Sequence, residues 1–300
     1  MPVIGDRLSS LVARDYAVGY PDECVLIRGG FGVNDTYRVT VGDQRFVLRV
    51  QSSPPTKGWI AGDGDLRFEL DLLAHLFRHG VPVATPLPRI SGDLLGIQMD
   101  DGQEFSYSLF AWAPGEVVPD DRLTSDQARL VGEALAKVHL AADAFRSEHP
   151  RYRLDLEALL DKPLMKLAST LEDLSPADRR FVEEQVSDIR GRLDTFTRGP
   201  DLWGIIHGDI HSQNLHVTDD GSITLFDFDL CAYGWRAYDV AYYYTRIPAT
   251  VRQFALDGYT SIRSLSDIEH DLLPTFGRAA WVWEGLRAPN LVARLRDPFL

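Results

Sequence analysis

The chain has 300 residues, of which 45% are hydrophobic and 25% are charged, the composition of an ordinary soluble globular protein. That length suits one large domain or two lobes. The 31 basic and 44 acidic side chains give a formal net charge of −13. This balance argues against a nucleic-acid partner, which would require a basic surface. It is compatible with a cationic substrate, or simply with a solvated acidic surface.

The two cysteines, Cys24 and Cys231, lie far apart in the sequence and form no CxxC motif. They therefore argue against a disulfide scaffold and against a zinc site built from thiolates, and they fit a reducing compartment. The first residues, MPVIGDRLSS, lack the basic and apolar regions of a signal peptide. No apolar run approaches the roughly 18 residues of a spanning helix. We therefore expect a soluble, cytoplasmic protein with no membrane partner.

The first 110 residues predict a small antiparallel sheet that carries one helix. Residues 64–80 have leucine and phenylalanine at helical spacing, and Gly80 is suited to end that helix. A glycine cluster, GGFGVND at residues 29–35, separates the first two strand-like runs. Short runs rich in β-branched and aromatic residues, bounded by turn residues, predict the strands: residues 25–28, 36–41, 45–50, 94–99 and 104–113.

After the segment APGE, residues 113–116, the pattern becomes mainly helical. Thr124 and Gln127 form a capping-box pair ahead of an amphipathic helix that runs to about residue 145. Helices are also predicted at about residues 155–170, 176–196 and from 237 onward, and short strands at 215–217 and 222–229. The layout predicts an α+β chain with an antiparallel β-sheet lobe at residues 1–112 and a larger, mainly helical lobe at residues 113–300.

The octapeptide HGDIHSQN, residues 207–214, lies between two apolar runs. Asp209 follows His207 by two positions, Asn214 follows Asp209 by five, and Asp227 ends a later strand-like run. Metal-assisted phosphoryl transfer needs one carboxylate that accepts the proton of the attacking hydroxyl, with an amide and a second carboxylate that hold magnesium. The spacing H-x-D-x-x-x-x-N, followed by D-F-x, is that of the protein-kinase catalytic loop and its magnesium aspartate. The pattern therefore predicts a kinase-like centre.

A buried ion pair is predicted in the β-sheet lobe. Glu69 lies on the apolar stripe of the helix at residues 64–80, where a carboxylate is costly unless it finds a cationic partner. Arg49, in the strand-like run FVLRV, stands where kinases place the lysine that pairs with a helix glutamate and with the nucleotide phosphates. A surface glutamate and an edge arginine are the alternative. The glycine cluster suits a loop whose backbone approaches phosphates closely.

Together, HGDIHSQN, LFDFDLCAYGWRAYDVA, GGFGVNDTYRV, FVLRV and FAWAPGE resemble the aminoglycoside phosphotransferase/choline kinase family, over about residues 25–286. These are small-molecule kinases with a protein-kinase-like bilobal fold, and the HGD-to-DFD segment is the most specific part of the resemblance. It implies ATP bound between the lobes, Asp209 as catalytic base, and Mg²⁺ held by Asn214 and Asp227. It also implies nucleotide contacts from the glycine loop, the ion pair and a hinge strand: Gly30, Phe31, Gly32, Asn34, Arg49, Glu69, Ser108, Leu109, Phe110 and Ala111.

Two positions depart from the family's pattern. Arg49 stands in place of the usual lysine, and it keeps the charge but is planar and bulkier. The glycine loop lacks a third glycine and has Asn34 and Asp35 instead, so that Asp35 must turn away from bound phosphates. These departures are the only support for an alternative of another class, a nucleotide-binding pseudokinase or regulatory module.

The other polar and aromatic candidates also admit structural interpretations. His207 is expected to orient the loop, and His211 is close enough to contact substrate. A histidine–metal hydrolase is disfavoured, because glycine follows the first histidine where zincins have glutamate. Asp229 is expected to be structural or to act through water, and Asp239 to cap the loop. The tail is rich in aromatic residues that form core, and a few residues are candidates for a substrate pocket: Trp235, Trp281, Trp283 and Glu284.

These features predict an ATP- and Mg²⁺-dependent phosphotransferase acting on a hydroxyl of a small, amino-bearing and cationic molecule. Examples are an aminoglycoside-like antibiotic, as in antibiotic resistance, and a homoserine- or choline-like amino alcohol. Asp155, Glu157 and Asp161 could hold such a cation, and a solvated helix face is an equal alternative. The segments AYGWRAYDVAYYY and DGYTSIRSLSDIEHDLLPTF also resemble a bacterial branch that includes a stress-response Ser/Thr protein kinase. That activity is the alternative within the same fold. The sequence leaves the oligomeric state open.

Overall fold

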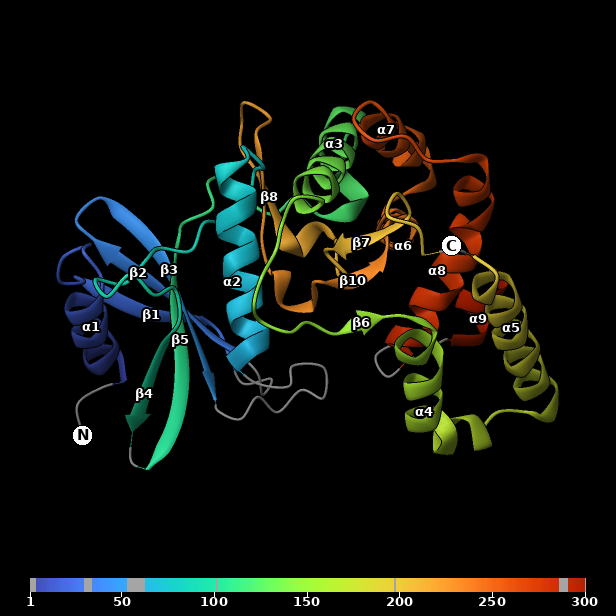
Figure 1. The fold of residues 1–300 in the computed structure, drawn as a ribbon, viewed down its shortest axis with the longest axis horizontal. Coiled ribbons are helices and arrows are strands. Elements are labelled where there is room, and N and C mark those ends of the chain that lie inside the picture. The colour runs from blue at the N-terminus through green and yellow to red at the C-terminus, as the bar shows by residue number, and fades with distance from the viewer. Residues whose placement is uncertain are drawn as a thin grey trace. The chain divides into compact units, whose positions relative to one another are not determined.

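The computed structural model describes residues 4–29, 34–52, 63–100, 102–196, 198–285 and 291–299 (Figure 1). Contacts within the chain divide it into two compact units. The first unit comprises Met1–Pro114, Phe145–Arg151 and Thr224–Asp229. The second comprises Gly115–Ala144, Tyr152–Ile223 and Leu230–Leu300.

The first unit is built on a five-stranded antiparallel sheet of order β1-β2-β3-β5-β4. The predicted β-rich runs form these strands, and the register sets Arg49 of β3 opposite Ser108 of β5. Gly42, with φ of 55°, turns the chain between β2 and β3, a conformation that favours glycine. The strands are β1 (Glu23–Arg28), β2 (Asn34–Val41), β3 (Gln44–Ser52), β4 (Gly96–Asp100) and β5 (Gln103–Ala111).

The predicted helix of the first unit is α2 (Asp63–Arg78). Its Leu66, Leu70 and Leu73 are buried, as their spacing indicated, whereas Phe77 is exposed in the last turn. Gly80 ends the helix with φ of 73°, the left-handed conformation common after a helix C-terminus. The helical stripe therefore fixes which face of α2 packs inward, and Glu69 lies on that face with 1% of its surface exposed.

A further helix, α1 (Ile4–Asp15), was not predicted from the sequence. Its Leu8, Leu11 and Val12 are buried in the core of the first unit, against side chains of β2, β3 and β5. The three residues stand at helical spacing, so a signal was present in a segment considered only for its lack of a signal peptide. Tyr107 of β5 donates its hydroxyl proton to Asp15 and ties the end of α1 to the sheet.

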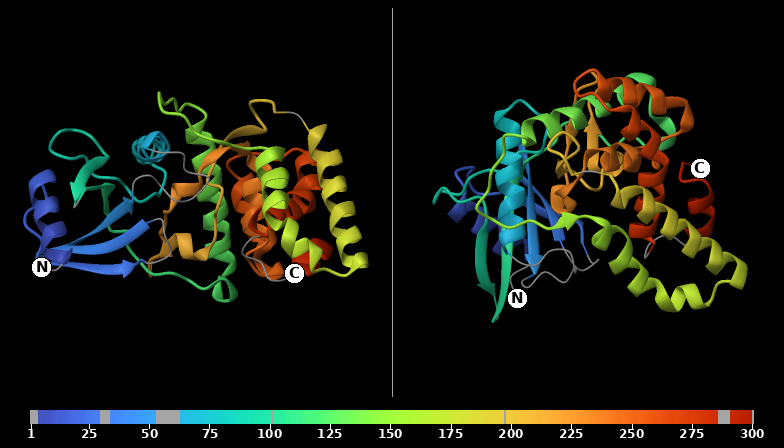
Figure 2. Two further views of the ribbon diagram at one scale, coloured as in Figure 1. Left: turned by 90° about the horizontal axis from the view of Figure 1, so that it is seen from below. Right: turned by 45° about the vertical axis from the view of Figure 1, so that its right-hand side comes forward.

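The second unit combines many helices with a small sheet of order β6-β10-β7, in which β10 pairs parallel with β6 and antiparallel with β7 (Figure 2). The predicted capping box of Thr124 and Gln127 is present at the start of α3. The helices are α3 (Ser125–Ala142), α4 (Lys162–Glu172), which continues a π-helical turn at Glu157–Asp161, α5 (Pro176–Asp194), α6 (Arg236–Tyr244), α7 (Ala249–Thr260), α8 (Asp267–Glu284) and α9 (Leu291–Arg296). The short strands are β6 (Arg153–Leu154), β7 (Trp203–Ile206), β8 (Leu215–Val217), β9 (Ile223–Leu225), which begins in this unit and ends in the first, and β10 (Ala232–Trp235).

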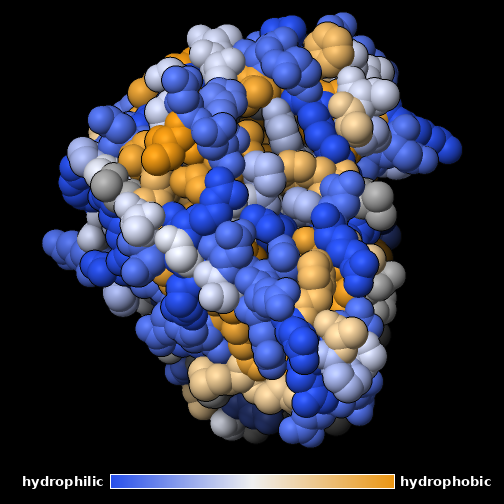
Figure 3. All heavy atoms as spheres, turned by 90° about the vertical axis from the view of Figure 1, so that its right-hand side faces the viewer, coloured by the Kyte–Doolittle hydropathy of each residue, from blue (hydrophilic) through white to orange (hydrophobic). Residues whose placement is uncertain are grey.

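Figure 3 shows hydrophilic side chains interspersed with separate groups of hydrophobic ones on one face of the molecule. Within the described ranges, no helix is both long and apolar enough to cross a bilayer.

Two glycines let α3 and α7 cross closely. A Cβ added at Gly132 would lie 2.0 Å from the carbonyl oxygen of Ala255, and one at Gly258 would lie 2.0 Å from that of Arg129. Real Cβ atoms do not approach backbone oxygens so closely. The two helices can therefore pack at this distance only because glycine stands at both positions. This crossing supports α3, whose His139 contacts the candidate site described below.

We expect Gly132→Ala to destabilise the protein by about 1–3 kcal/mol, the cost of overpacking a tight contact, and to fall at the upper end because the obstacle is backbone. The control is Gly191→Ala on α5, where an added Cβ meets nothing within 4 Å. That change should stabilise the protein by about 0.5–1 kcal/mol, since alanine favours a helix interior. Urea unfolding measures both, and equal effects would contradict the packing argument.

Candidate active site

A buried carboxylate fixes the backbone of the loop at residues 207–214. Asp239, on α6, accepts hydrogen bonds from the N–H of His207 at 2.6 Å and from the N–H of Gly208 at 2.8 Å. Gly208 has φ of 83°, and a Cβ there would lie 2.3 Å from the carbonyl oxygen of Leu230. Only glycine fits this position without strain. The prediction that Asp239 caps the loop is confirmed.

A second buried group supports Asp239 from behind. His139 of α3 is fully buried, with Nε2 3.0 Å from Asp239 Oδ2 and Nδ1 2.8 Å from the hydroxyl of Tyr259. A carboxylate only accepts, so Nε2 carries the ring proton and Nδ1 accepts from the tyrosine. Burial lowers the pKa of His139, and the bond to Asp239 offsets this only in part. His139 is therefore a neutral positioning group.

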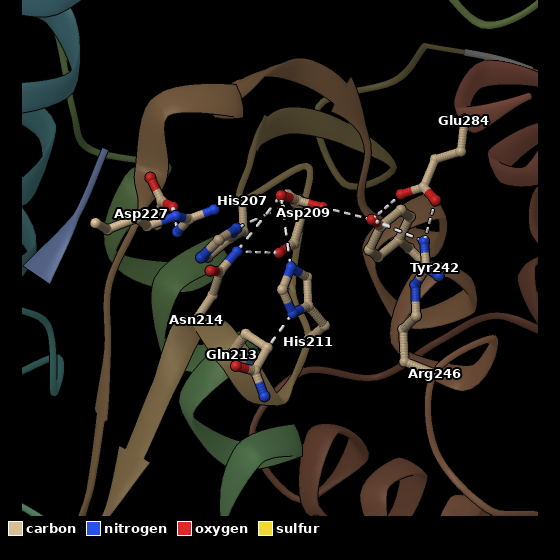
Figure 4. A network of polar contacts seen from close by, with 10 residues as sticks. His207, Asp209, His211, Gln213, Asn214, Asp227, Tyr242, Arg246 and Glu284 are labelled. Atoms are coloured by element: carbon tan, nitrogen blue, oxygen red, sulfur yellow. Dashed lines mark hydrogen bonds and ion pairs between the residues drawn. The ribbon is translucent and has the colours of Figure 1, made fainter. Parts of the chain in front are cut away.

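The carboxylate of Asp209 lies in the loop that Asp239 fixes (Figure 4). Tyr242 donates its hydroxyl proton to Oδ1. His211 Nε2 lies 3.7 Å from Oδ2, and Asn214 Nδ2 donates to the backbone carbonyl at 2.9 Å. Burial raises the pKa of Asp209, but His211 and Tyr242 outweigh it, so that the pKa lies below its usual value. Asp209 is therefore ionised at neutral pH and able to accept a proton.

The neighbouring side chains of this loop have defined contacts. Asn214 uses its amide nitrogen toward Asp209, which leaves the carbonyl oxygen, the kind of ligand that Mg²⁺ prefers. His207 Nδ1 accepts from the N–H of Asp209 at 3.3 Å, and His211 Nδ1 accepts from the N–H of Gln213 at 3.2 Å. The two histidines thus stabilise the backbone of the loop. Within the part of the chain that the structure describes, no group of three or more His, Cys, Asp or Glu side chains could hold a metal ion.

The first unit contains the predicted ion pair. Arg49 donates from both terminal nitrogens to the carboxylate of Glu69, at 2.7 and 2.9 Å, and both side chains are buried. Burial lowers the pKa of Arg49, but the charge and hydrogen bonds of Glu69 outweigh it and leave the pKa raised. The guanidinium lies 5.0 Å from the ring centroid of Phe110. Its Nε is buried with no hydrogen-bond partner in the described structure, so Glu69 does not use all of the guanidinium's donors.

Two aspartates of the first unit lie in the field of this guanidinium. Asp227 and Asp229 both act to raise the pKa of Arg49. Asp227 has φ of 62° and is the one non-glycine residue of the described ranges with a positive φ. Its Oδ2 lies 3.4 Å from Nη1 of the exposed Arg28. Residues with such strained backbone conformations occur more often at functional sites than elsewhere. Asp229 is buried, and its backbone carbonyl accepts from Arg151.

The hinge strand uses much of its backbone within the first unit. The N–H of Ala111 donates to the carbonyl of Thr85 at 2.9 Å, and the carbonyl of Leu109 accepts from the N–H of Leu87 at 2.7 Å. An adenine contact that needs a backbone donor must therefore use an N–H other than that of Ala111. The hydroxyl of Ser108 is buried without a hydrogen-bond partner in the part described. Asn34 begins β2. The predicted loop residues Gly30, Phe31 and Gly32 lie outside the described residues.

The candidates from the tail separate into two groups. Trp235 packs in the interior of the second unit, with its ring 4.7 Å from Trp203 and 5.8 Å from Phe276. Glu284 Oε1 instead lies at hydrogen-bonding distance from the hydroxyl oxygen of Tyr242, the residue that also contacts Asp209. Core packing thus accounts for Trp235, whereas Glu284 lies in the network around the base.

Two residues of this network, Tyr242 and Arg246, were missed from the sequence. Arg246 pairs with Glu284, donates to the Tyr242 oxygen at 3.0 Å and lies 4.6 Å from the ring centroid of Trp281. Tyr242 had been assigned to the core together with most of the aromatic residues of the tail. Its position three residues after Asp239 was the available signal, since positions i and i+3 of a helix share a face.

Comparison with known proteins gives the family and the fold of the chain. The model of the phosphotransferase enzyme family matches residues 23–282. A homoserine kinase of Rhizobium rhizogenes is 32% identical over 232 residues, which are 72% of this chain and 66% of that protein.

Two solved structures have the same fold. That of amicoumacin kinase hAmiN, which contains AMP-PNP and Ca²⁺, has a TM-score of 0.75 at 20% identity and covers 99% of this chain and 92% of its own. That of a microcompartment-associated aminopropanol kinase has a TM-score of 0.75 at 22% identity, with 98% and 94% covered. The expected protein-kinase-like α+β fold is confirmed.

We expect acid to destabilise the protein through His139. Because its pKa in the folded state is lowered, the unfolded chain binds the proton more readily. The contribution to stability is complete above the ordinary histidine pKa of about 6.5 and is lost as the pH falls below it, by up to about 1.4 kcal/mol per pH unit. Urea unfolding between pH 7.5 and 5 measures this slope. In His139→Gln that part of the slope should be absent, and an equal slope in both proteins would contradict the assignment.

Proposed function

Because the chain belongs to the phosphotransferase enzyme family, we propose that it transfers the γ-phosphoryl group of ATP to a hydroxyl of a small, amino-bearing molecule. The observation that carries this proposal is the state of Asp209. Its carboxylate is mostly buried and ionised, and side chains of the same unit orient it from both oxygens. An oriented carboxylate of this kind is what a general base for an attacking hydroxyl requires.

In this proposal Asp209 accepts the proton of the acceptor hydroxyl as its oxygen attacks the γ-phosphorus. The new bond joins the acceptor oxygen to phosphorus, and the bond between phosphorus and the β–γ bridging oxygen breaks, so that ADP leaves. Asp239 and His139 contribute by holding the loop backbone, which keeps the carboxylate in place without touching the reacting atoms. Catalysis of phosphoryl transfer rests mainly on such positioning and on charge stabilisation.

We assign the triphosphate to Arg49, supported by its positive charge and by the donors of its guanidinium, Nε among them, that Glu69 does not use. Mg²⁺ is assigned to Asp227 and to the carbonyl oxygen of Asn214, both hard oxygen ligands. When bound, the metal would offset the charge that develops on the phosphate oxygens. The left-handed backbone of Asp227 supports a specialised role. Aspartate adopts this conformation at some energetic cost, and proteins keep such residues mainly where their side chains are needed.

The amino-bearing acceptor is supported by charge and by the named relatives. Asp209 and Glu284 put two carboxylates around the phenol of Tyr242, against one guanidinium from Arg246. This excess of negative charge favours a cation near the base. Homoserine and aminopropanol, named for two similar proteins, each carry an amine and a hydroxyl. A coupled ADP-release screen over amino alcohols, aminoglycosides and a Ser/Thr peptide library identifies the acceptor and tests the protein-kinase alternative.

We expect Asp209→Asn to lower turnover by about 10²–10⁴-fold, the usual contribution of a general base. The amide keeps the shape and can still accept from Tyr242, so folding and ATP binding should be retained. Coupled ADP release in the presence of Mg²⁺ and the acceptor from the screen measures the rate, with thermal unfolding as the control. Full turnover in this variant would refute the role of Asp209, and ATP binding without turnover in the native protein would favour the pseudokinase.

We expect Asp227→Asn to raise the Mg²⁺ concentration needed for half-maximal turnover by at least about tenfold, since a charged ligand is replaced by a neutral one. Asparagine also adopts the left-handed backbone, so the change tests the charge and not the conformation. The measurement is a Mg²⁺ titration of ADP release. Nucleotide binding without metal, followed by calorimetry, should be unaffected, and an unchanged titration would remove Asp227 from the metal site.

A further inference from the structure

Tyr242 joins the candidate base to a partly buried ion pair of the second unit, Arg246 with Glu284 (Figure 4). Its hydroxyl lies at hydrogen-bonding distance from Asp209 Oδ1 on one side and from Glu284 Oε1 on the other. Arg246, four residues further along the chain, donates from Nη2 to the phenol oxygen at 3.0 Å and pairs with Glu284 Oε2. The catalytic loop, α6 and α8 therefore meet at one phenol.

This arrangement poses a question of proton count. A phenol has one proton and can donate to only one of two carboxylates at a time. Burial, with the charges of Asp209 and Glu284 beside it, raises the pKa of Tyr242 well above its usual value, so the phenol remains a donor. Arg246 bonds Glu284 directly and offsets its charge. Because Arg246 already pairs with Glu284, Tyr242 donates its phenol proton to Asp209.

Packing fixes the ring that carries this proton. Tyr242 is fully buried on α6, with the ring of Tyr238 centred 5.9 Å away and the guanidinium of Arg246 4.7 Å from its centroid. Trp281 holds the same guanidinium from α8, 4.6 Å from its centroid. A donor held this way fixes the rotation of the Asp209 carboxylate, with Oδ1 bound to the phenol and Oδ2 turned to the other side of the side chain.

We propose that Tyr242 is a positioning residue for phosphoryl transfer: its phenol holds Oδ1 of Asp209 so that Oδ2 receives the acceptor's proton, and Arg246 directs the phenol by occupying Glu284. This inference rests on the proposed function, because it takes Asp209 as the base. Without the phenol, only the longer contacts of Oδ2 with His211 and Asn214 orient the carboxylate, and ATP and the acceptor can still bind. Loss of the phenol should therefore lower kcat and leave KM unchanged.

The first test is Tyr242→Phe, which keeps the ring and removes only the hydroxyl. We expect kcat to fall about 10- to 100-fold, the range for misplacing a reacting group, with KM for ATP and acceptor within about twofold. The assay is MgATP turnover with 1-amino-2-propanol as acceptor. If the protein does not phosphorylate that alcohol, the assay is ATP hydrolysis, with water as the acceptor. The matched control is Tyr243→Phe on the same helix, whose buried hydroxyl has no hydrogen-bond partner within the described ranges. It should leave kcat within about twofold.

The second test is Arg246→Gln, at a side chain that is 21% exposed. It keeps the phenol but frees Glu284 to compete for its proton, so kcat should fall with KM unchanged. Because both residues act through one hydroxyl, the double variant Tyr242→Phe/Arg246→Gln should lose no more than Tyr242→Phe alone, whereas independent structural defects would multiply. The single variant Arg246→Gln also gives a result if thermal unfolding shows that Tyr242→Phe does not fold.

Wild-type kcat in Tyr242→Phe, an unchanged kcat in Arg246→Gln, or losses that multiply in the double variant would each overturn the positioning role. Failure of the proposed function has a different signature. If Asp209→Asn retains full turnover, Asp209 is not the base and both proposals fall. If Asp209→Asn is inactive while Tyr242→Phe behaves as wild type, only the role of Tyr242 is lost.

Discussion

The buried carboxylate of Asp239 is the interaction on which the candidate site of the second unit depends. It accepts two backbone N–H groups at the start of the loop and a ring proton from His139. Backbone donors buried without a partner are costly, so these bonds determine a single conformation for the loop. Gly208 is required there because its φ of 83° and its closeness to the Leu230 carbonyl exclude a side chain. The direction of Asp209 follows from this backbone.

In each unit an arginine offsets the negative charge of buried carboxylates. In the first, Arg49 and Glu69 are buried together, so that each offsets the cost of burying the other. In the second, Asp209 and Glu284 share one phenol while Arg246 supplies the positive charge. Arginine suits both places, because its fork of donors binds a carboxylate and still retains a nitrogen for another partner. The replacement of the usual lysine by Arg49 therefore preserves the pairing that the sequence pattern indicated.

Most secondary structure was predictable, because periodicity and turn residues report local preference directly. The strands of the first unit, α2, and the capping box of α3 agree with the prediction. Helix α1 was missed although its apolar spacing is regular. The contact of the hinge strand with adenine stays a prediction, and the structure adds that the N–H of Ala111 and the carbonyl of Leu109 bond within the first unit. Such bonds depend on a segment over 20 residues away, which no local pattern reveals.

The sequence by itself determined which chemical groups are available: the loop from His207 to Asn214, the aspartate at 227, and a strand arginine matched to a helix glutamate. Their types and order are local properties, so spacing was enough to indicate phosphoryl transfer. Only the tertiary structure decided that Tyr242 contacts Asp209 and links it to Arg246 and Glu284, and that Trp235 belongs to the core. Those contacts join residues distant in the chain, and packing of α6 against α8 and the loop creates them.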